Sequence, residues 1–193
     1  MKVLPRFKKK INCVYQNTGK LTDQLELNSI YVWEQASPDL IERVFKDVPK
    51  KKDALKKLLN EGAKGVIIFD GLQWVAHGFI SPPGVALPEH LPIKVVKNHW
   101  WLFYMHTRES YRGRGLQKLC TRIRMQIINK NRKNHEQIFT DIGLNNIASR
   151  RCFIRNRFAE KGLIVNYNLY LPKVRPITIW FRWDKNKAHP KLL

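Results

Sequence analysis

Hydrophobic positions in the first part of the chain predict a strand followed by two helices. Residues 28–35 are rich in β-branched and aromatic side chains, which favour a strand. Ser37 and Pro38 then form a typical helix start, with serine as the cap and proline at the first helical position. Apolar residues recur at helical spacing after them and again in residues 51–60, which end near Gly62.

The rest of the pattern predicts alternating strands and helices. Residues 66–69 and 73–80 flank Asp70-Gly71, a strong hairpin signal, and prolines between 81 and 92 predict a loop. The other expected elements are strands at 99–106, 137–142, 163–171 and 177–183 and helices at 116–128 and 147–156. The resulting order is β-α-α-β-β-β-α-β-α-β-β.

A glycine-rich segment, Tyr111-Arg112-Gly113-Arg114-Gly115-Leu116, joins the strand at 99–106 to the following helix. Strand, glycine-rich turn and helix together form a phosphate-binding device, because glycine lets the backbone approach a ligand. The free N–H groups of the helix N-terminus then hold negative charge. The plainer alternative is a basic turn that contains two glycines.

A second motif, Asn146-Ile147-Ala148-Ser149, is followed by Cys152, Phe153 and Phe158. Together the two motifs resemble those of the GNAT (Gcn5-related N-acetyltransferase) superfamily. The resemblance implies an α/β (α+β) fold with a mixed, mostly antiparallel sheet flanked by helices. It also implies binding of acetyl-CoA or another acyl-CoA by Met105, Arg112, Gly113, Arg114, Gly115, Leu116, Asn146, Ser149 and Phe153. Asn146 could instead serve only as a helix cap.

Three positions depart from the family pattern. Gln117 stands where a second small residue is usual, and Arg157 replaces a glycine that usually ends the helix. Phe153 occupies the position of a tyrosine that often protonates the departing CoA thiolate, and a phenyl ring cannot donate a proton. These changes leave the fold and cofactor expectations intact and put the usual acid step in doubt.

Acyl transfer to an amine requires a neutral amine and a stabilised oxyanion. The candidates for this chemistry are Tyr104, His106 and Asp141, with Glu109 as a further proton-transfer group. Strand alternation predicts that Tyr104 and His106 share a face with Trp100 and Leu102. Each candidate also has a structural alternative. Tyr104 could be a core aromatic and His106 a histidine that ends a strand. Asp141 could be a hydrogen-bonded carboxylate and Glu109 an exposed turn residue.

The histidines show no metal-ligand spacing, so no metal site is expected. A site assembled from distant residues, such as His77, His106 and Asp141, stays open. Three cysteines without a C-x-x-C pair predict reduced core thiols at Cys120 and Cys152 and a cytoplasmic protein. No secretory signal or membrane-spanning run is recognisable, and no membrane partner is expected.

The 193 residues fit a single domain, 1–193, with a basic N-terminal arm at about 1–27. Thirty-six Lys and Arg against fifteen Asp and Glu give a net charge of +21. The excess is spread along the chain and far exceeds what a CoA site needs, which predicts a nucleic-acid partner, DNA or tRNA. Trp180 and Trp183 add aromatic groups to a basic C-terminal segment.

Three functions follow from these observations. The first is an acyl-CoA-dependent N-acyltransferase that acts on a nucleic acid or a nucleic-acid-linked amine, as in Mom-type DNA adenine modification or aminoacyl-tRNA acetylation. The second is a GNAT acetyltransferase of a small amine, amino sugar or protein amine. The third is a non-catalytic, basic binding protein of the same fold. The sequence identifies neither the acyl donor nor the acceptor atom nor the oligomeric state.

Overall fold

The computed structural model describes residues 6–19, 30–85, 98–171 and 177–184, of which 178–181, 183 and 184 are described by their backbone alone. Its elements follow the predicted order with one additional strand at the N-terminus. They are β1 (Arg6–Asn17), β2 (Val32–Gln35), α1 (Pro38–Val44), α2 (Pro49–Asn60), β3 (Lys64–Asp70), β4 (Gln73–Ser81), β5 (Trp100–Thr107), the short 3-10 helix η1 (Glu109–Tyr111), α4 (Leu116–Asn131), β6 (Ile138–Gly143), α5 (Ile147–Arg155), β7 (Phe158–Tyr170) and β8 (Ile177–Asp184).

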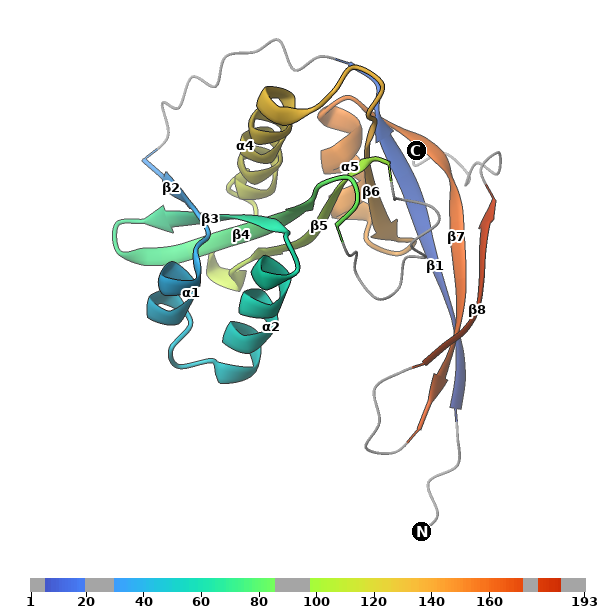
Figure 1. Cartoon of the computed structure of the whole chain (residues 1–193), viewed down its shortest axis with the longest axis horizontal. Helices are drawn as coiled ribbons and strands as arrows, with labels where there is room; N and C mark the ends of the chain where they lie inside the picture. The colour runs from blue at the N-terminus through green and yellow to red at the C-terminus, as the bar shows by residue number, and fades with distance from the viewer. Residues whose placement is uncertain (1–5, 20–29, 86–97, 172–176, 185–193) are drawn as a thin grey trace.

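The eight strands form one sheet in the order β2-β3-β4-β5-β6-β1-β7-β8 (Figure 1). Neighbouring strands are antiparallel except β5 and β6, which run parallel. The predicted mixed, mostly antiparallel sheet flanked by helices is therefore confirmed. None of the helices in the described ranges combines the length and apolar character that a membrane crossing requires.

Residues 6–17 of the segment predicted as a basic N-terminal arm are instead a strand inside the sheet, and residues 1–5 and 20–27 lie outside the described ranges. From Arg6 to Asn17, β1 pairs with β7, and its second half also pairs with β6 at Asn12–Gln16. Five basic residues at the start of the chain concealed a strand whose apolar part, Ile11 to Tyr15, is short. The buried side chains of Cys13, Val14 and Tyr15 therefore belong to the core of the fold.

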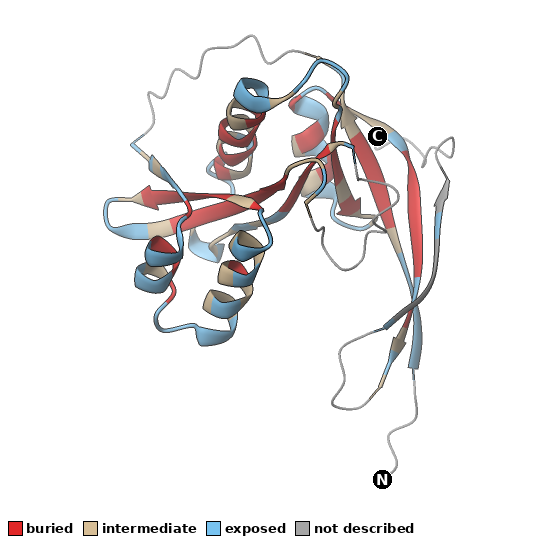
Figure 2. Ribbon diagram, in the orientation of Figure 1, coloured by how far each residue is buried: buried red, intermediate tan, exposed pale blue. Residues whose placement is uncertain are grey.

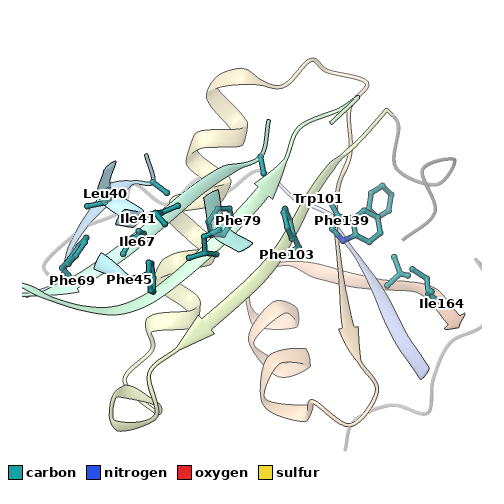
Figure 3. Close-up of a cluster of buried hydrophobic side chains, with 14 residues drawn as sticks. Leu40, Ile41, Phe45, Ile67, Phe69, Phe79, Trp101, Phe103, Phe139 and Ile164 are labelled. Atoms are coloured by element: carbon teal, nitrogen blue, oxygen red, sulfur yellow. The ribbon is translucent and has the colours of Figure 1, made fainter. Parts of the chain in front are cut away.

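Helices cover both faces of the sheet, and buried residues follow the strands between them (Figure 2). On one face, α1 and α2 supply Leu40, Ile41, Phe45 and Leu55 to a cluster with Phe79, Trp101, Phe103 and Phe139 (Figure 3). On the other face, α4 and α5 pack on Trp100, Leu102 and their neighbours. The side-chain alternation of Trp100, Trp101, Leu102 and Phe103 thus fills both layers.

A bulge interrupts β5 at Tyr104 and changes which side chains share a face. Phe103 pairs with Phe79 and His106 with His77, so two residues of β5 lie opposite Gly78 alone. Tyr104 adopts the left-handed backbone conformation, with φ of 51°. The predicted alternation is therefore wrong beyond Phe103: Tyr104 and His106 lie on the α1–α2 side and not with Trp100 and Leu102.

The two parallel strands part just where the bulge begins. β5 and β6 pair only over Trp100–Leu102 and Ile138–Thr140. The Thr140 hydroxyl donates to the Leu102 carbonyl at 2.9 Å and closes this short ladder. Beyond it, Tyr104 and Met105 lie in a part of β5 that is not paired with β6.

Arg124, on α4, fixes the helix to the bulge from within the core. Its side chain is fully buried. One guanidinium nitrogen donates to the carbonyls of Phe79 at 3.1 Å and Phe103 at 3.4 Å. A Cβ on Gly78 would lie 2.8 Å from the guanidinium carbon, so the strand can approach the helix only because residue 78 is glycine.

Replacing Arg124 with leucine is expected to destabilise the protein by about 2–3 kcal/mol. The substitution leaves buried carbonyl groups without their donor, and each unsatisfied group costs about 1–3 kcal/mol. Urea denaturation measures the change in unfolding free energy. The matched control is Lys130→Leu on an exposed position of the same helix, where about 0.5 kcal/mol or less is expected. Equal stability of the two variants would contradict the role assigned to Arg124.

Candidate functional site

A cleft of about 760 Å³ lies between the N-terminal ends of α4 and α5 and the end of β5. It brings together most of the residues that the sequence assigned to a cofactor: Met105, Arg112, Gly113, Gly115, Leu116, Asn146 and Ser149. His106, predicted as catalytic, also lines it. Segments far apart in the sequence therefore meet at one site, as the two motifs predicted.

The glycine-rich turn presents an open helix N-terminus to this cleft. Gly113 and Gly115 have φ of 81° and 76°, a conformation that residues with a side chain rarely adopt. A Cβ built on either glycine meets no atom within 4 Å, so the space beside the backbone is empty. α4 has no side-chain cap and no acidic residue in its first turn. Its first N–H groups are therefore available to an anion.

The charges around the cleft favour the same kind of ligand. Four of its lining residues have cationic side chains, and no carboxylate is among the described residues that line it. The cations are Arg112, Lys118, Arg151 and Arg155. Glu109, the further proton-transfer candidate, pairs with Arg112 at 3.4 Å outside the lining set. A di- or polyphosphate group matches this balance of charge.

Gln117 joins the two motifs across the cleft. Its side-chain amide donates to the Ser149 hydroxyl at 2.6 Å, which ties the first turn of α4 to the first turn of α5. The Asn146 side-chain oxygen accepts from the Ser149 backbone N–H at 3.2 Å and caps α5. Asn146 therefore has the capping role that was considered as the alternative to cofactor binding. Gln117, which stands where the family pattern has a small residue, makes a contact that a small residue could not make.

Two residues predicted to bind the cofactor do not line the cleft. Phe153 is buried, and its ring packs edge-on against Phe158 with centroids 5.0 Å apart. The Arg114 guanidinium lies over the Tyr111 ring at 4.6 Å. The Tyr111 hydroxyl in turn donates to Asp70 at 3.0 Å, which anchors the turn to the β3–β4 hairpin.

The cleft contains a thiol beside the position where the resemblance places a tyrosine. Cys152 lines the cleft, and burial raises the pKa of its thiol. Cys120 and Cys152 are both free thiols, as predicted, and Cys120 is buried. The prediction of a core position is wrong for Cys152, which is only partly buried because it lines the cleft.

Four aromatic and imidazole rings gather on the α1–α2 side of the bulge and form what we call the histidine–aromatic cluster. Its members are Trp74, His77, Tyr104 and His106. His77 stacks on His106 at 5.6 Å and on Tyr104 at 5.9 Å between ring centroids. Because His106 also lines the cleft, it connects this cluster with the cleft at the N-terminal ends of α4 and α5. Tyr104 is 47% exposed and so is accessible from solvent.

Lys51, on α2, is the one charged group of α2 that packs on this cluster, and sequence reasoning missed it. Its ammonium lies 4.3 Å from the centre of the Trp74 ring and 5.0 Å from that of Phe45. Burial, followed by repulsion from Arg108, lowers the pKa of Lys51 to about 8. Its neighbours Lys50 and Lys52 make the sequence resemble a solvated helix face, so only the structure distinguishes it.

The histidines of the cluster are kept neutral at pH 7. Burial, then the charges of Lys51, Arg112 and Arg108, lower the pKa of His106. Burial is also the main reason that the pKa of His77 lies well below its usual range. Neither nitrogen of His77 has a well-aligned hydrogen-bond partner among the described residues, although the Tyr104 backbone lies near enough to favour its protonated form.

Asp141 lies away from the cleft lining and has two hydrogen-bond donors. Trp101 Nε1 donates to one carboxylate oxygen at 3.0 Å, and the Asn12 amide donates to the other. This is the structural alternative considered for Asp141, and its catalytic role stays a prediction. No three potential metal ligands come together in the described part of the chain. His77 and His106 therefore do not assemble there with Asp141 into a metal site.

No model of a protein family matches the sequence, and no curated protein matches it. Solved structures with a similar fold include a GCN5-related N-acetyltransferase-like protein from Streptococcus suis (16% identity, TM-score 0.52, 86% of this chain and 63% of that one). They also include a GNAT-family acetyltransferase from Colwellia psychrerythraea (13%, TM-score 0.54, 85% and 55%). The aminoglycoside 6'-N-acetyltransferase AAC(6')-Ig from Acinetobacter haemolyticus is a third (16%, TM-score 0.50, 67% and 91%).

The chain thus spans less than two thirds of the length of the first two of these proteins. At such identities the likeness concerns the fold alone. The protein has the fold of the GNAT acetyltransferases, as the two motifs predicted.

Replacing Lys51 with methionine is expected to raise the pKa of His106. The methionine keeps the apolar stem and removes a positive charge that disfavours imidazolium. Histidine side-chain signals followed by NMR from pH 5 to 8 measure the midpoint, and His106→Gln identifies the signal. A larger fraction of His106 should then be protonated near pH 6. Lys57→Met, at an exposed site of α2, should leave the midpoint unchanged; equal shifts in both variants would contradict the assignment.

Proposed function

We propose that this protein is an acyl-CoA-dependent N-acyltransferase. The observation that carries the proposal is the open N-terminus of α4, which meets a cation-lined cleft at the point where β5 and β6 part. The backbone N–H groups after Gly115 would hold the pyrophosphate of an acyl-CoA. Met105 and the Gln117–Ser149 contact border the path that the pantetheine arm would follow toward the bulge.

The residues at the bulge suggest how the chain would carry out the transfer. The amine nitrogen must attack the thioester carbon while the carbon–sulfur bond breaks and the amine loses a proton. His106 is suited to accept that proton, because its lowered pKa keeps the imidazole neutral at pH 7. Backbone N–H groups freed by the bulge would polarise the carbonyl. Phe153 supplies no proton to the thiolate, which would take one from solvent.

The acceptor is proposed to be an amine presented on the α1–α2 side of the bulge, where Tyr104 is exposed. The fold that this chain shares with an aminoglycoside acetyltransferase supports a small amine, an amino sugar or a protein amine. The net charge of +21 supports an amine carried by a nucleic acid, such as an adenine or an aminoacyl-tRNA. The two acceptor classes differ in charge, and a single assay can compare them.

The assay incubates purified protein and carbon-14-labelled acetyl-CoA with separate pools of tRNA, duplex DNA, a basic protein and small amines. Mass spectrometry of the digested nucleosides, peptides and amines locates the added mass. Acylated product in any pool, absent with His106→Gln, supports the transferase. A failure of every pool, together with no binding of CoA, would overturn it. Product only in the nucleic-acid pools would select that acceptor class over the others.

Replacing Gly115 with alanine is expected to weaken CoA binding by at least about 10-fold, which corresponds to about 1.4 kcal/mol. The new Cβ would occupy space beside the N–H groups that the phosphates need, and a positive φ disfavours alanine. Isothermal titration calorimetry measures the affinity.

Gly71→Ala is the matched control for this experiment. Gly71 also has a positive φ, 55°, and a Cβ there meets nothing within 4 Å, but it lies in the β3–β4 hairpin outside the cleft lining. Both variants should lose a similar amount of stability in urea, while only Gly115→Ala loses affinity. Wild-type affinity in Gly115→Ala would show that the ligand does not approach this turn.

A further inference from the structure

The β1–β7–β8 end of the sheet projects from the body of the protein, away from α4 and α5 (Figure 1). We call it the basic ribbon and define it as residues 6–10 of β1, 166–170 of β7 and 177–182 of β8. All five residues of β1 in this segment are exposed (Figure 2). Neither the cleft nor the histidine–aromatic cluster includes any of these residues.

The ribbon is strongly basic and has no carboxylate. Arg6, Lys8, Lys9 and Lys10 lie in β1, and Arg182 is exposed on β8. No Asp or Glu occurs in the three segments of the ribbon. β1 and β7 are antiparallel and in direct register here, with Lys8 opposite Asn168 and Lys10 opposite Asn166. The cations of the ribbon are therefore not accompanied by an acidic residue in these three segments.

Cations occur on both faces of the ribbon. Strand alternation places Arg6, Lys8 and Lys10 on one face and Lys9 with Phe7 on the other. Lys9 lies directly opposite Tyr167, so it interrupts the face that carries Phe7 and Tyr167, whereas Tyr170 lies opposite Arg6 on the other face. Neither face offers the continuous apolar surface with which a protein enters a lipid bilayer.

Two exposed tyrosines accompany these lysines. The Lys8 ammonium lies 5.3 Å from the centre of the Tyr170 ring, and the Lys9 ammonium 6.0 Å from that of Tyr167. Tyr167 and Tyr170 remain 38% and 36% exposed. Rings held beside cations at a surface suit a ligand that combines phosphates with flat bases, because phosphates pair with the cations and bases stack on the rings.

A structural explanation of the lysines accounts for only part of this arrangement. β6 pairs with β1 only from Asn12 to Gln16, so residues 6–10 leave one strand edge without a partner among the described strands. Lysines on such an edge prevent it from pairing with other chains. That purpose also covers Arg182, because β8 is the outer strand of the sheet, but it requires no tyrosines beside the lysines.

We propose that the basic ribbon binds nucleic acid through its phosphate backbone, with Tyr170, on the same face as Arg6, Lys8 and Lys10, contributing stacking to unpaired bases. The exposed Tyr170 ring favours a strand with accessible bases over a duplex. This proposal does not rest on acyl transfer, because binding is measured without CoA. It would place a polyanion on the face of the sheet that also carries α1 and α2, since Arg6, Lys8 and Lys10 share a face with Val14 of that core cluster.

The experiment measures fluorescence anisotropy of labelled 20-nucleotide single-stranded RNA, single-stranded DNA and duplex DNA between 50 and 200 mM salt. The test variant changes Lys8, Lys9 and Lys10 together to glutamine. The control changes the exposed Lys46, Lys50 and Lys57 to glutamine, which removes the same charge from α2 and the turn before it. A third variant, with arginine at positions 8, 9 and 10, keeps the ribbon charge.

The ribbon variant is expected to bind at least about 10-fold more weakly at 100 mM salt and to lose about two units of the salt slope, since each phosphate contact contributes about 0.7–0.9. The α2 control and the arginine variant should stay near wild type. Tyr170→Leu should weaken binding to single strands more than to duplex. Circular dichroism and size-exclusion chromatography confirm that each variant is folded and unaggregated.

Three results would overturn the proposal. One is an equal loss in the ribbon variant and the α2 control, which would assign binding to the net charge alone. Another is the absence of binding at 50 mM salt. The last is stronger binding to vesicles containing phosphatidylserine than to any of the nucleic acids, with the same dependence on Lys8, Lys9 and Lys10. If the glutamine variant is unfolded, the single variants Lys8→Gln and Lys10→Gln give the same comparison in smaller steps.

Discussion

The buried guanidinium of Arg124 is the contact on which the rest of this structure depends. A cation without a carboxylate partner is costly in a protein interior, and it is tolerated only when hydrogen bonds surround it. Here its acceptors include the carbonyls of Phe79 on β4 and Phe103 on β5, immediately before the bulge. The same side chain therefore fixes the distance of α4 from the sheet. It also fixes the point at which the side chains of β5 stop alternating regularly between the two faces of the sheet. Both the open N-terminus of α4 and the exposed Tyr104 are consequences of that arrangement.

The bulge separates two environments with different electrostatics: a cation-lined cleft on one side and a cluster that contains two neutral imidazoles on the other. On the α4–α5 side, cations line a cleft and would be neutralised by a bound anion. On the α1–α2 side, Lys51 is packed against rings, which screen it poorly from His77 and His106. Burial is the main reason that the pKa values of these two imidazoles are lowered, and the charge of Lys51 lowers both further. Burial and a neighbouring cation together therefore keep two proton acceptors neutral near pH 7.

Much of the fold could be predicted from the sequence because its helices and hairpin obey local rules. The Ser37 cap, the Asp70-Gly71 turn and the glycines before α4 each carry their own signal. β1 could not be found in this way, since its charged half resembles an arm and its pairing partners lie more than a hundred residues away. The bulge at Tyr104 depends on Gly78 and Arg124, which no local pattern connects. Lys51 is one of three consecutive lysines in the sequence, and only its packing against the Phe45 and Trp74 rings distinguishes it from the other two.

The position of β1 has a consequence for how the chain is made. β1 finds its partners, β6 and β7, only after residues 138–170 have been synthesised, whereas β2 to β5 can pair with one another earlier. During that interval β1 is an unpaired strand in a growing chain, the kind of segment that aggregates most readily. Its lysines repel other copies of the same strand. The lysines of β1 therefore disfavour self-association of this strand during the interval before it pairs with β6 and β7.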